Sequence, residues 1–207
     1  MTPAVPVLAA LLALQPAPSP KTAPATLDTA VLAGGCFWGT EGIFEHVKGV
    51  VQVISGYAGG TLPNPTSAQV YKGGTGHAES VMIIFDPARV SFDQLLLIFF
   101  NVAHNPTELN RQGPDIGSDY RSIAFYRDST QKQSIEDAIA GLKTRRIYSD
   151  PIVTEVLALR AFYPAEAEHQ GFMQRHLTDP YITTNDLPRL DILRTRYASL
   201  YREQWHD

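Results

Sequence analysis

Short runs of β-branched and aromatic residues, bounded by glycine, proline and polar residues, recur along the chain and predict strands. We expect these strands at residues 30–33, 50–55, 79–85, 122–126 and 152–157. They alternate with segments of helical periodicity, and no internal repeat links them. The pattern therefore predicts a two-layer α+β domain built around one sheet.

Three helices are predicted between or after these strands. Ser91 and Gln94 have the spacing of a capping box, which places a helix from Ser91 to about Val102. An apolar stripe predicts another helix, and its members are Ile135, Ile139 and Leu142. Pro164 suits the first turn of a helix over residues 166–175. Residues 56–76 are rich in glycine and proline and lack periodicity, which is typical of an ordered functional loop.

Composition limits the classes of function. A chain of 207 residues with 44% hydrophobic content can bury the core of one domain. The net charge of −4 offers no basic surface, so we expect neither nucleic acid nor an acidic membrane as a partner. A single cysteine cannot form an internal disulfide, and with scattered histidines it supplies no zinc ligand set. We therefore expect no metal, no bound cofactor, and a monomer.

Residues 1–25 have features of an export signal. Residues 5–14 form an apolar stretch of signal-peptide length, far short of the ~20 residues that span a bilayer. Residues 23–25 offer a cleavage site before Thr26, although a positively charged start is missing. We expect a signal peptide at 1–25, a folded domain at 26–207, and a periplasmic or secreted location. A disordered extension on a cytoplasmic protein is the alternative.

Cys36 stands where a strand gives way to a helix. The run at residues 30–33, a glycine pair, and an apolar pattern that includes Phe37 and Trp38 predict strand, tight turn and helix. At a helix start, the free N–H groups and the helix dipole favour an anion. We therefore expect the pKa of the Cys36 thiol to be lowered and its thiolate to be a nucleophile. An inert, buried core thiol is the alternative.

Four motifs in a fixed order resemble the peptide-methionine (S)-S-oxide reductases, the type A methionine sulfoxide reductases. They are GCFWG at residues 35–39, GYAGG with PNPT at residues 56–66, TGHAE at residues 75–79, and RQGPDIGSDYRS at residues 111–122. The pairs at residues 165–166 and 169–170, and NDLP at residues 185–188, extend the resemblance from about Leu27 to about Tyr201. The resemblance implies a ferredoxin-like βαβ core wrapped by long coils.

The chemistry of a sulfoxide explains which residue types such a site needs. Its sulfur is a poor electrophile unless the oxygen gains a proton as a nucleophile attacks, so a thiolate and an acid must act together. Cys36 and Glu79 are the candidates. A carboxyl group desolvated by nearby aromatic side chains would have its pKa raised toward neutrality and remain protonated.

The resemblance assigns each role to a residue of this chain. Cys36 would attack sulfur and become a sulfenic acid, while Glu79 would donate a proton to the oxygen. Phe37 and Trp38 would form the wall for the S-methyl group. Tyr120 would hydrogen-bond the sulfoxide oxygen, and Asp115 would organise the site. The implied reaction is repair of methionine-(S)-sulfoxide in oxidised proteins and as the free amino acid.

Two departures from the family pattern bear on the reaction. Ser67 is a substrate-binding position where many members have a tyrosine aimed at the sulfoxide oxygen. A serine hydroxyl lies several ångströms short of a phenol's reach, so either a water fills the gap or Tyr120 and Glu79 carry more of the load. The printed chain also lacks a resolving cysteine, so we expect an external thiol, either a thioredoxin-like or glutaredoxin-like protein or a small thiol. Asn105 follows His104 where an aspartate is expected.

Two other classes of function remain at this point. A hydrolase could pair Cys36 with His77, His104 or His169, although no orienting residue or oxyanion hole is indicated. A peptide-binding module with an inert thiol would need no chemistry at all. We interpret His77 and His104 as structural, with a catalytic base as the alternative.

Overall fold

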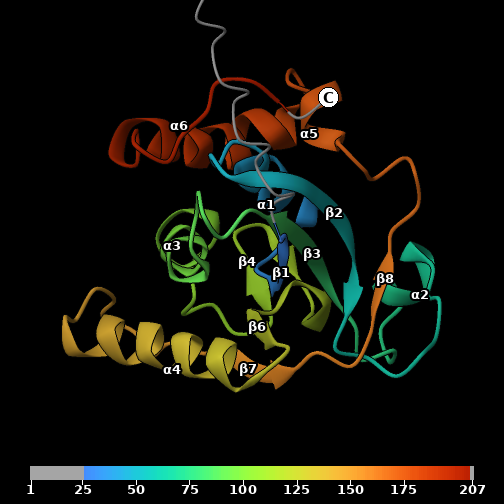
Figure 1. The fold of residues 1–207 in the computed structure, drawn as a ribbon. Helices are drawn as coiled ribbons and strands as arrows, with labels where there is room; N and C mark the ends of the chain where they lie inside the picture. The colour runs from blue at the N-terminus through green and yellow to red at the C-terminus, as the bar shows by residue number, and fades with distance from the viewer. Residues whose placement is uncertain (1–25, 206–207) are drawn as a thin grey trace, which may run out of the picture.

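A single curled sheet organises the part of the chain that the computed structural model describes, residues 26–205 (Figure 1). Its order is β7-β6-β1-β3-β2-β8, and all neighbours are antiparallel except β6 and β7, which are parallel. The strands are β1 Asp28–Ala33, β2 Val50–Ala58, β3 Ala78–Phe85, β6 Ile123–Tyr126, β7 Glu155–Ala158 and β8 Phe162–Pro164. A separate two-stranded hairpin joins β4 Arg111–Gln112 to β5 Asp115–Ile116.

Some of the helices begin where a side chain caps the first turn. The α-helices are α1 Phe37–Glu45, α2 Ser67–Tyr71, α3 Phe92–Ile98, α4 Ser129–Thr144, α5 Phe172–Arg175 and α6 Leu187–Arg196. Short irregular helices are η1 Phe99–Ala103, which continues α3, η2 Ser118–Tyr120, and η3 Ile182–Asp186 before α6. Capping boxes start α2 at Thr66 and α3 at Ser91, and the Asp128 side chain caps α4.

The two faces of the sheet carry two apolar clusters. Alternation along β1 sends Ala30 and Leu32 into the larger cluster, together with side chains of α1, α3, η1 and α4. Val31 and Ala33 point to the other face, where a smaller cluster includes Phe125 and is covered in part by Leu159 and Phe162. Helices thus cover one face, as the predicted two-layer α+β domain requires. Figure 1 shows α3 beside α4, and α6 above α1.

The pairing of β1 with β3 brings two distant segments together. Leu32 near the end of β1 lies opposite Val81 of β3. Because the two strands are antiparallel, the first residues of β3, which include Glu79, extend beyond the end of β1. Glu79 lies opposite Tyr57 of β2 and on the same face as Val81, which belongs to the helix-covered core. This register places Glu79 where the chain leaves β1 for α1.

Several predicted elements differ from the observed ones. A helix over residues 166–175 is wrong: Pro164 ends the edge strand β8, and only Phe172–Arg175 is helical, after Gly171 adopts a left-handed φ of 58°. The strand expected at 152–157 starts only at Glu155, because Val153 donates its N–H to the Pro106 carbonyl instead of joining the sheet. The predicted loop at 56–76 contains the end of β2 and all of α2.

The predicted signal peptide at 1–25 lies outside the described residues. Within residues 26–205, no helix has the length and apolar character needed to cross a membrane.

Candidate active site

Cys36 is the N-cap residue of α1, as the strand, turn and helix pattern predicts. The turn depends on Gly35, whose φ of +89° is rarely adopted by residues with a side chain. A Cβ atom there would also lie 2.5 Å from the Gln112 Cγ. Cys36 is partly exposed as a residue and borders the main apolar cluster at the start of the helix.

Glu79 lies directly beside this helix start. The Phe37 backbone N–H, the first amide of α1, donates to Glu79 Oε2 at 2.9 Å. Glu79 is only 1% exposed, and its other oxygen, Oε1, has no hydrogen-bond partner within 3.5 Å among the described residues. The protein therefore holds one carboxyl oxygen in place, and the second is buried with no hydrogen-bond partner among the described residues.

Burial raises the pKa of Glu79 from 4.5 to about 8, although the Phe37 amide and the Tyr71 hydroxyl lower it in part. The negative charges of Asp119 and Asp115 raise it further. The carboxyl group is consequently protonated at neutral pH, and it loses this proton as the pH rises through about 8. This direction is the one that the sequence predicts for an acid catalyst.

The pKa of Cys36 corrects a prediction. Burial raises the pKa of the thiol well above 9.0, and the charges of Glu79, Asp186 and Asp115 raise it as well. The Trp38 amide lowers it, but the Phe37 amide donates to Glu79 instead. The helix start lowers the pKa of the thiol less than burial and the nearby carboxylates raise it. Cys36 is therefore a neutral thiol in the resting protein.

Three tyrosine side chains surround Glu79. Tyr57 lies opposite it on β2, Tyr120 is the last residue of η2, and Tyr71 is the last residue of α2. Burial raises the pKa of each phenol, and the charge of Glu79 raises it further. Tyr120 also lies near enough to Cys36 for the thiolate charge to raise its pKa. Tyr57 and Tyr71 are neighbours of Glu79 that the sequence analysis did not assign.

Ser67 is directed elsewhere. Its N–H and its hydroxyl both donate to Glu166 Oε1, at 2.8 and 3.1 Å. The Tyr57 hydroxyl donates to the other oxygen of Glu166 at 3.3 Å. The Ser67 side chain thus pairs with Glu166, and no hydrogen bond links it to Glu79 among the described residues.

The two aromatic residues after Cys36 differ in exposure. Phe37 is buried between Tyr57 and His169, with ring centroids 5.7 and 5.3 Å away. Trp38 is partly exposed, stacks on Phe172 at 3.7 Å between centroids, and donates its indole N–H to His169 Nδ1 at 3.3 Å. Trp38 is therefore the aromatic surface that borders solvent beside the thiol.

Side-chain contacts between Gln170 and β2 fix the partners of Trp38. The Gln170 amide exchanges hydrogen bonds with the Ser55 backbone, each at 2.9 Å. The Gly171 N–H donates to the buried Glu41 carboxylate on α1, also at 2.9 Å. These bonds hold the segment that carries His169 and Phe172 against α1.

Acidic residues from distant segments complete the surroundings of Cys36. Asp115 accepts a hydrogen bond from the Tyr181 hydroxyl, and the Tyr181 ring meets Trp38 edge-on at 6.1 Å. Asp186 is buried, its pKa is raised to about 7 by burial, and a Cβ atom at Gly39 of α1 would lie 2.1 Å from its Oδ1. No motif includes Tyr181, and the NDLP motif that contains Asp186 does not indicate its place beside Cys36, because both positions depend on the packing of η3 against α1.

The histidines have structural partners. His77 accepts the Gly60 N–H at Nδ1 and contacts the Leu62 carbonyl through Nε2. His104 contacts the Phe99 carbonyl and the Ser122 hydroxyl, and burial lowers its pKa to about 3. Both ring nitrogens of each are engaged, which supports the structural interpretation. The Asn105 side chain caps a turn by accepting the Thr107 N–H and hydroxyl.

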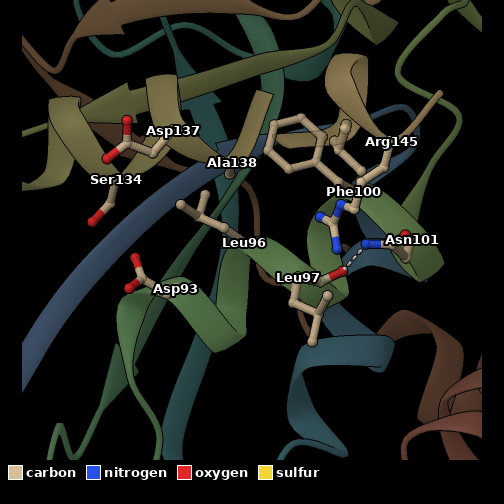
Figure 2. A pocket seen from close by; sticks show the side chains of 10 residues that line it. Asp93, Leu96, Leu97, Phe100, Asn101, Ser134, Asp137, Ala138 and Arg145 are labelled. Carbon is tan, nitrogen blue, oxygen red and sulfur yellow. Dashed lines mark hydrogen bonds between the residues drawn. The ribbon is translucent and has the colours of Figure 1, made fainter. Parts of the chain in front are cut away.

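A cavity of about 250 Å³ lies apart from this site, between α3 and α4. Figure 2 shows the side chains that line it, among them Leu96, Phe100 and Ala138. None of the residues that surround Cys36 lines it. Its lining contains neither a cysteine nor a histidine that could activate a hydroxyl, and the candidate chemistry therefore belongs to the group around Cys36 and Glu79.

Comparisons with known proteins agree with one another. A family model described as peptide methionine sulfoxide reductase matches residues 28–199. The peptide methionine sulfoxide reductase MsrA 2 of Mesorhizobium japonicum is 48% identical over 184 residues, which cover 89% of this chain and 94% of that protein. MsrA 2 of Synechocystis is 48% identical over 86% of this chain and 83% of that protein.

Solved structures show the same likeness. Methionine sulfoxide reductase A of Corynebacterium diphtheriae superposes with a TM-score of 0.66 at 34% identity, covering 76% of this chain and 78% of that one. Mxr1 of Saccharomyces cerevisiae in its reduced form gives a TM-score of 0.68 at 28% identity, covering 77% and 92%.

Alkylation tests the protonation state of the thiol. We expect slow reaction of Cys36 with iodoacetamide at pH 7, and a rate that rises with pH to a midpoint above 9. Glu79→Gln should move this midpoint to lower pH, because an ionised Glu79 no longer opposes the thiolate. Mass spectrometry follows this residue alone, since it is the only cysteine. A midpoint near or below 7 in the wild type contradicts the account.

Proposed function

Because the chain belongs to the peptide methionine sulfoxide reductase family, we propose that Cys36 and Glu79 together carry out its reaction. The chain is an oxidoreductase that reduces methionine sulfoxide to methionine and so repairs oxidised methionine. The observation that carries our assignment of residues is the Phe37 N–H to Glu79 bond, which holds an acid with one free oxygen beside the thiol. This activity excludes the two alternative functions, a hydrolase that pairs Cys36 with a histidine and a peptide-binding module with an inert thiol.

The first half-reaction transfers oxygen from the substrate to Cys36. The Glu79 proton passes to the sulfoxide oxygen as Cys36 Sγ attacks the substrate, the S–O bond of methionine sulfoxide breaks, and a Cys36 S–O bond forms. The thiol proton replaces the one that Glu79 gave up. The products are methionine and a Cys36 sulfenic acid, so the thiol is oxidised while the sulfoxide is reduced.

The neutral thiol does not hinder this sequence. Once Glu79 has given its proton to the substrate, it is a carboxylate beside Cys36 and can accept the thiol proton. Burial raises the pKa of both the Cys36 thiol and the Glu79 carboxyl, so both groups are protonated and uncharged before the substrate binds. The substrate oxygen is then the group that draws a proton out of the pair.

Neighbouring side chains suit the rest of the substrate. Trp38, backed by the buried Phe37, offers an apolar surface for the S-methyl group. Tyr120 supplies a hydroxyl near both Cys36 and Glu79, and Asp115 holds Tyr181 against Trp38. A methyl wall on one side and acid groups on the other favour one configuration at a chiral sulfur, for which we propose the S epimer.

The second half-reaction needs a thiol from outside the chain. The printed sequence contains one cysteine, so the sulfenic acid has no partner for a disulfide within it. We propose attack by a thioredoxin-like or glutaredoxin-like protein, or by a small thiol, followed by exchange of the mixed disulfide.

Three further assignments are proposals as well. The order β1-α1-β2-β3-α3-β6, with sheet order β6-β1-β3-β2, supports a ferredoxin-like centre with β7 and β8 added at its edges. The apolar stretch at residues 5–14 supports export to the periplasm or beyond. We propose a monomer that acts on oxidised proteins.

The test of function is a chromatographic assay. Dabsylated methionine sulfoxide, supplied as a mixture of epimers with dithiothreitol, should lose its S epimer and keep its R epimer. Cys36→Ser should abolish the loss, because an alcohol lacks the nucleophilicity of a thiolate. Equal consumption of both epimers, or retained activity in Cys36→Ser, rules out the proposed site.

Glu79→Gln should lower the rate of the first half-reaction by about 10²- to 10⁴-fold, the range typical of lost acid catalysis. The wild-type rate should fall on the alkaline side as Glu79 ionises near pH 8, and the variant should lack this limb. Rapid-quench measurement of methionine formed without reductant gives both quantities.

Glu45→Gln provides a matched control. Glu45 is also a buried acid with a pKa raised to about 7 by burial, but it lies at the far end of α1 from Cys36. Its replacement should leave the rate and the alkaline limb unchanged. A Glu79→Gln enzyme that matches Glu45→Gln shows that Glu79 is not the acid.

A further inference from the structure

We propose that Glu166 is a positioning residue for the substrate surface: it holds His169 in one tautomer and so fixes the indole of Trp38 beside Cys36. The inference rests on the role proposed above for Trp38, the apolar surface for the S-methyl group. Glu166 and His169 belong to the residue pairs at 165–166 and 169–170 that extend the sequence resemblance, and the proposed reaction steps use neither.

Three hydrogen bonds from two other elements hold the Glu166 carboxylate. The Ser67 N–H and hydroxyl of α2 donate to Oε1 at 2.8 and 3.1 Å, and the Tyr57 hydroxyl of β2 donates to Oε2 at 3.3 Å. Burial raises the pKa of Glu166, but these hydrogen bonds lower it by more, so the carboxyl group is ionised at neutral pH. The charge is therefore held in one place although the side chain is 32% exposed.

A backbone turn sets His169 beside this charge. The His169 N–H donates to the Glu166 carbonyl at 3.0 Å, and the Ala165 N–H donates to the Ser55 carbonyl at 2.9 Å. His169 Nε2 lies 4.0 Å from Glu166 Oε2, a distance at which the carboxylate charge acts on the ring without a direct hydrogen bond. One ring nitrogen of His169 thus faces Glu166, while the other faces Trp38.

The bond to Trp38 decides where the ring proton of His169 lies. An indole N–H can only donate, so the Nδ1 atom that receives it at 3.3 Å carries no proton. The ring proton is then on Nε2, the nitrogen that faces Glu166. A carboxylate stabilises an N–H that points toward it, and the partner of one ring nitrogen selects the tautomer of the whole ring. Glu166 therefore favours the tautomer that the Trp38 bond requires.

The His169 bond gives the Trp38 ring a direction that stacking alone does not give. Trp38 stacks on Phe172 with 3.7 Å between centroids, and offset stacking allows a ring to slide and turn in its own plane. A hydrogen bond at the indole nitrogen opposes that movement. Phe37 is buried and packs on His169 at 5.3 Å, so it stays in place when Trp38 turns. Loss of the Glu166 charge should therefore change how Trp38 meets the substrate.

Glu166→Gln tests this role in single-turnover measurements on the full chain, with a methionine sulfoxide peptide and no reductant. Glutamine keeps an oxygen that can accept from Ser67, but it lacks the charge that faces His169. We expect the peptide concentration that gives half the maximal rate to rise roughly two- to tenfold, as the net loss of one hydrogen bond allows. The maximal rate and the alkaline limb should stay those of the wild type, because Glu79 keeps its bond to the Phe37 N–H.

Fluorescence reports on Trp38 itself. The chain contains two tryptophans, so Trp205→Phe leaves Trp38 as the only one. In this background, Glu166→Gln should move the emission maximum to longer wavelength, because an indole that loses its hydrogen bond to His169 is more hydrated. A purely structural role for Glu166 would lower the thermal midpoint and leave both the emission and the half-maximal concentration of the folded protein unchanged.

Glu168→Gln is the matched control. Glu168 lies in the same turn as Glu166, and its side chain is exposed. The substitution removes the same charge from the same segment. It should keep the wild-type half-maximal concentration and emission.

The outcomes separate this inference from the proposed function. An unchanged half-maximal concentration or an unchanged emission in Glu166→Gln overturns the positioning role, and so does an equal effect in Glu168→Gln. A change in both quantities that is confined to Glu166→Gln supports it. If Cys36→Ser or Glu79→Gln keeps wild-type activity, the proposed function fails, while the emission of Trp38 still shows whether Glu166 fixes the indole.

Discussion

The hydrogen bond from the Phe37 N–H to Glu79 is the contact on which the site depends. It joins the first amide of α1 to β3 across 42 positions of sequence, and so sets the thiol beside the acid. The bond is possible because β3 runs on past the end of β1 and alternation turns Glu79 toward α1. It also uses one of the free donors of the helix start, which then cannot stabilise a thiolate.

This sharing of donors explains the resting state of the protein. Cys36 lies among Glu79, Asp186 and Asp115, and burial with these charges raises its pKa. A thiol that rests protonated reacts slowly with other oxidants, since thiolate character governs both alkylation and oxidation. Reactivity then depends on a substrate that can take a proton from Glu79, which couples the chemistry to recognition of the sulfoxide.

Local patterns predict the parts of the site that local sequence determines. The strand, glycine turn and helix around Cys36, and the cap at Ser91, follow from residues a few positions apart. The direction of the Cys36 pKa does not, because it follows first from burial in the folded protein and then from the charges of Glu79 and Asp186, which lie 43 and 150 positions away in the chain. Ser67 is likewise directed by Glu166, 99 positions away, and the helix predicted after Pro164 is prevented by Gly171 and by the Gln170 bonds to Ser55.

The central claim is that Glu79 is a neutral acid beside a neutral thiol, and infrared titration of its carboxyl group tests it most directly. The difference between the spectra of wild type and Glu79→Gln isolates this residue from the other buried carboxyls. The account predicts a protonated carboxyl band at pH 7 that disappears with a midpoint near pH 8. A band that is already lost near pH 4.5, the ordinary value for glutamate, would contradict it.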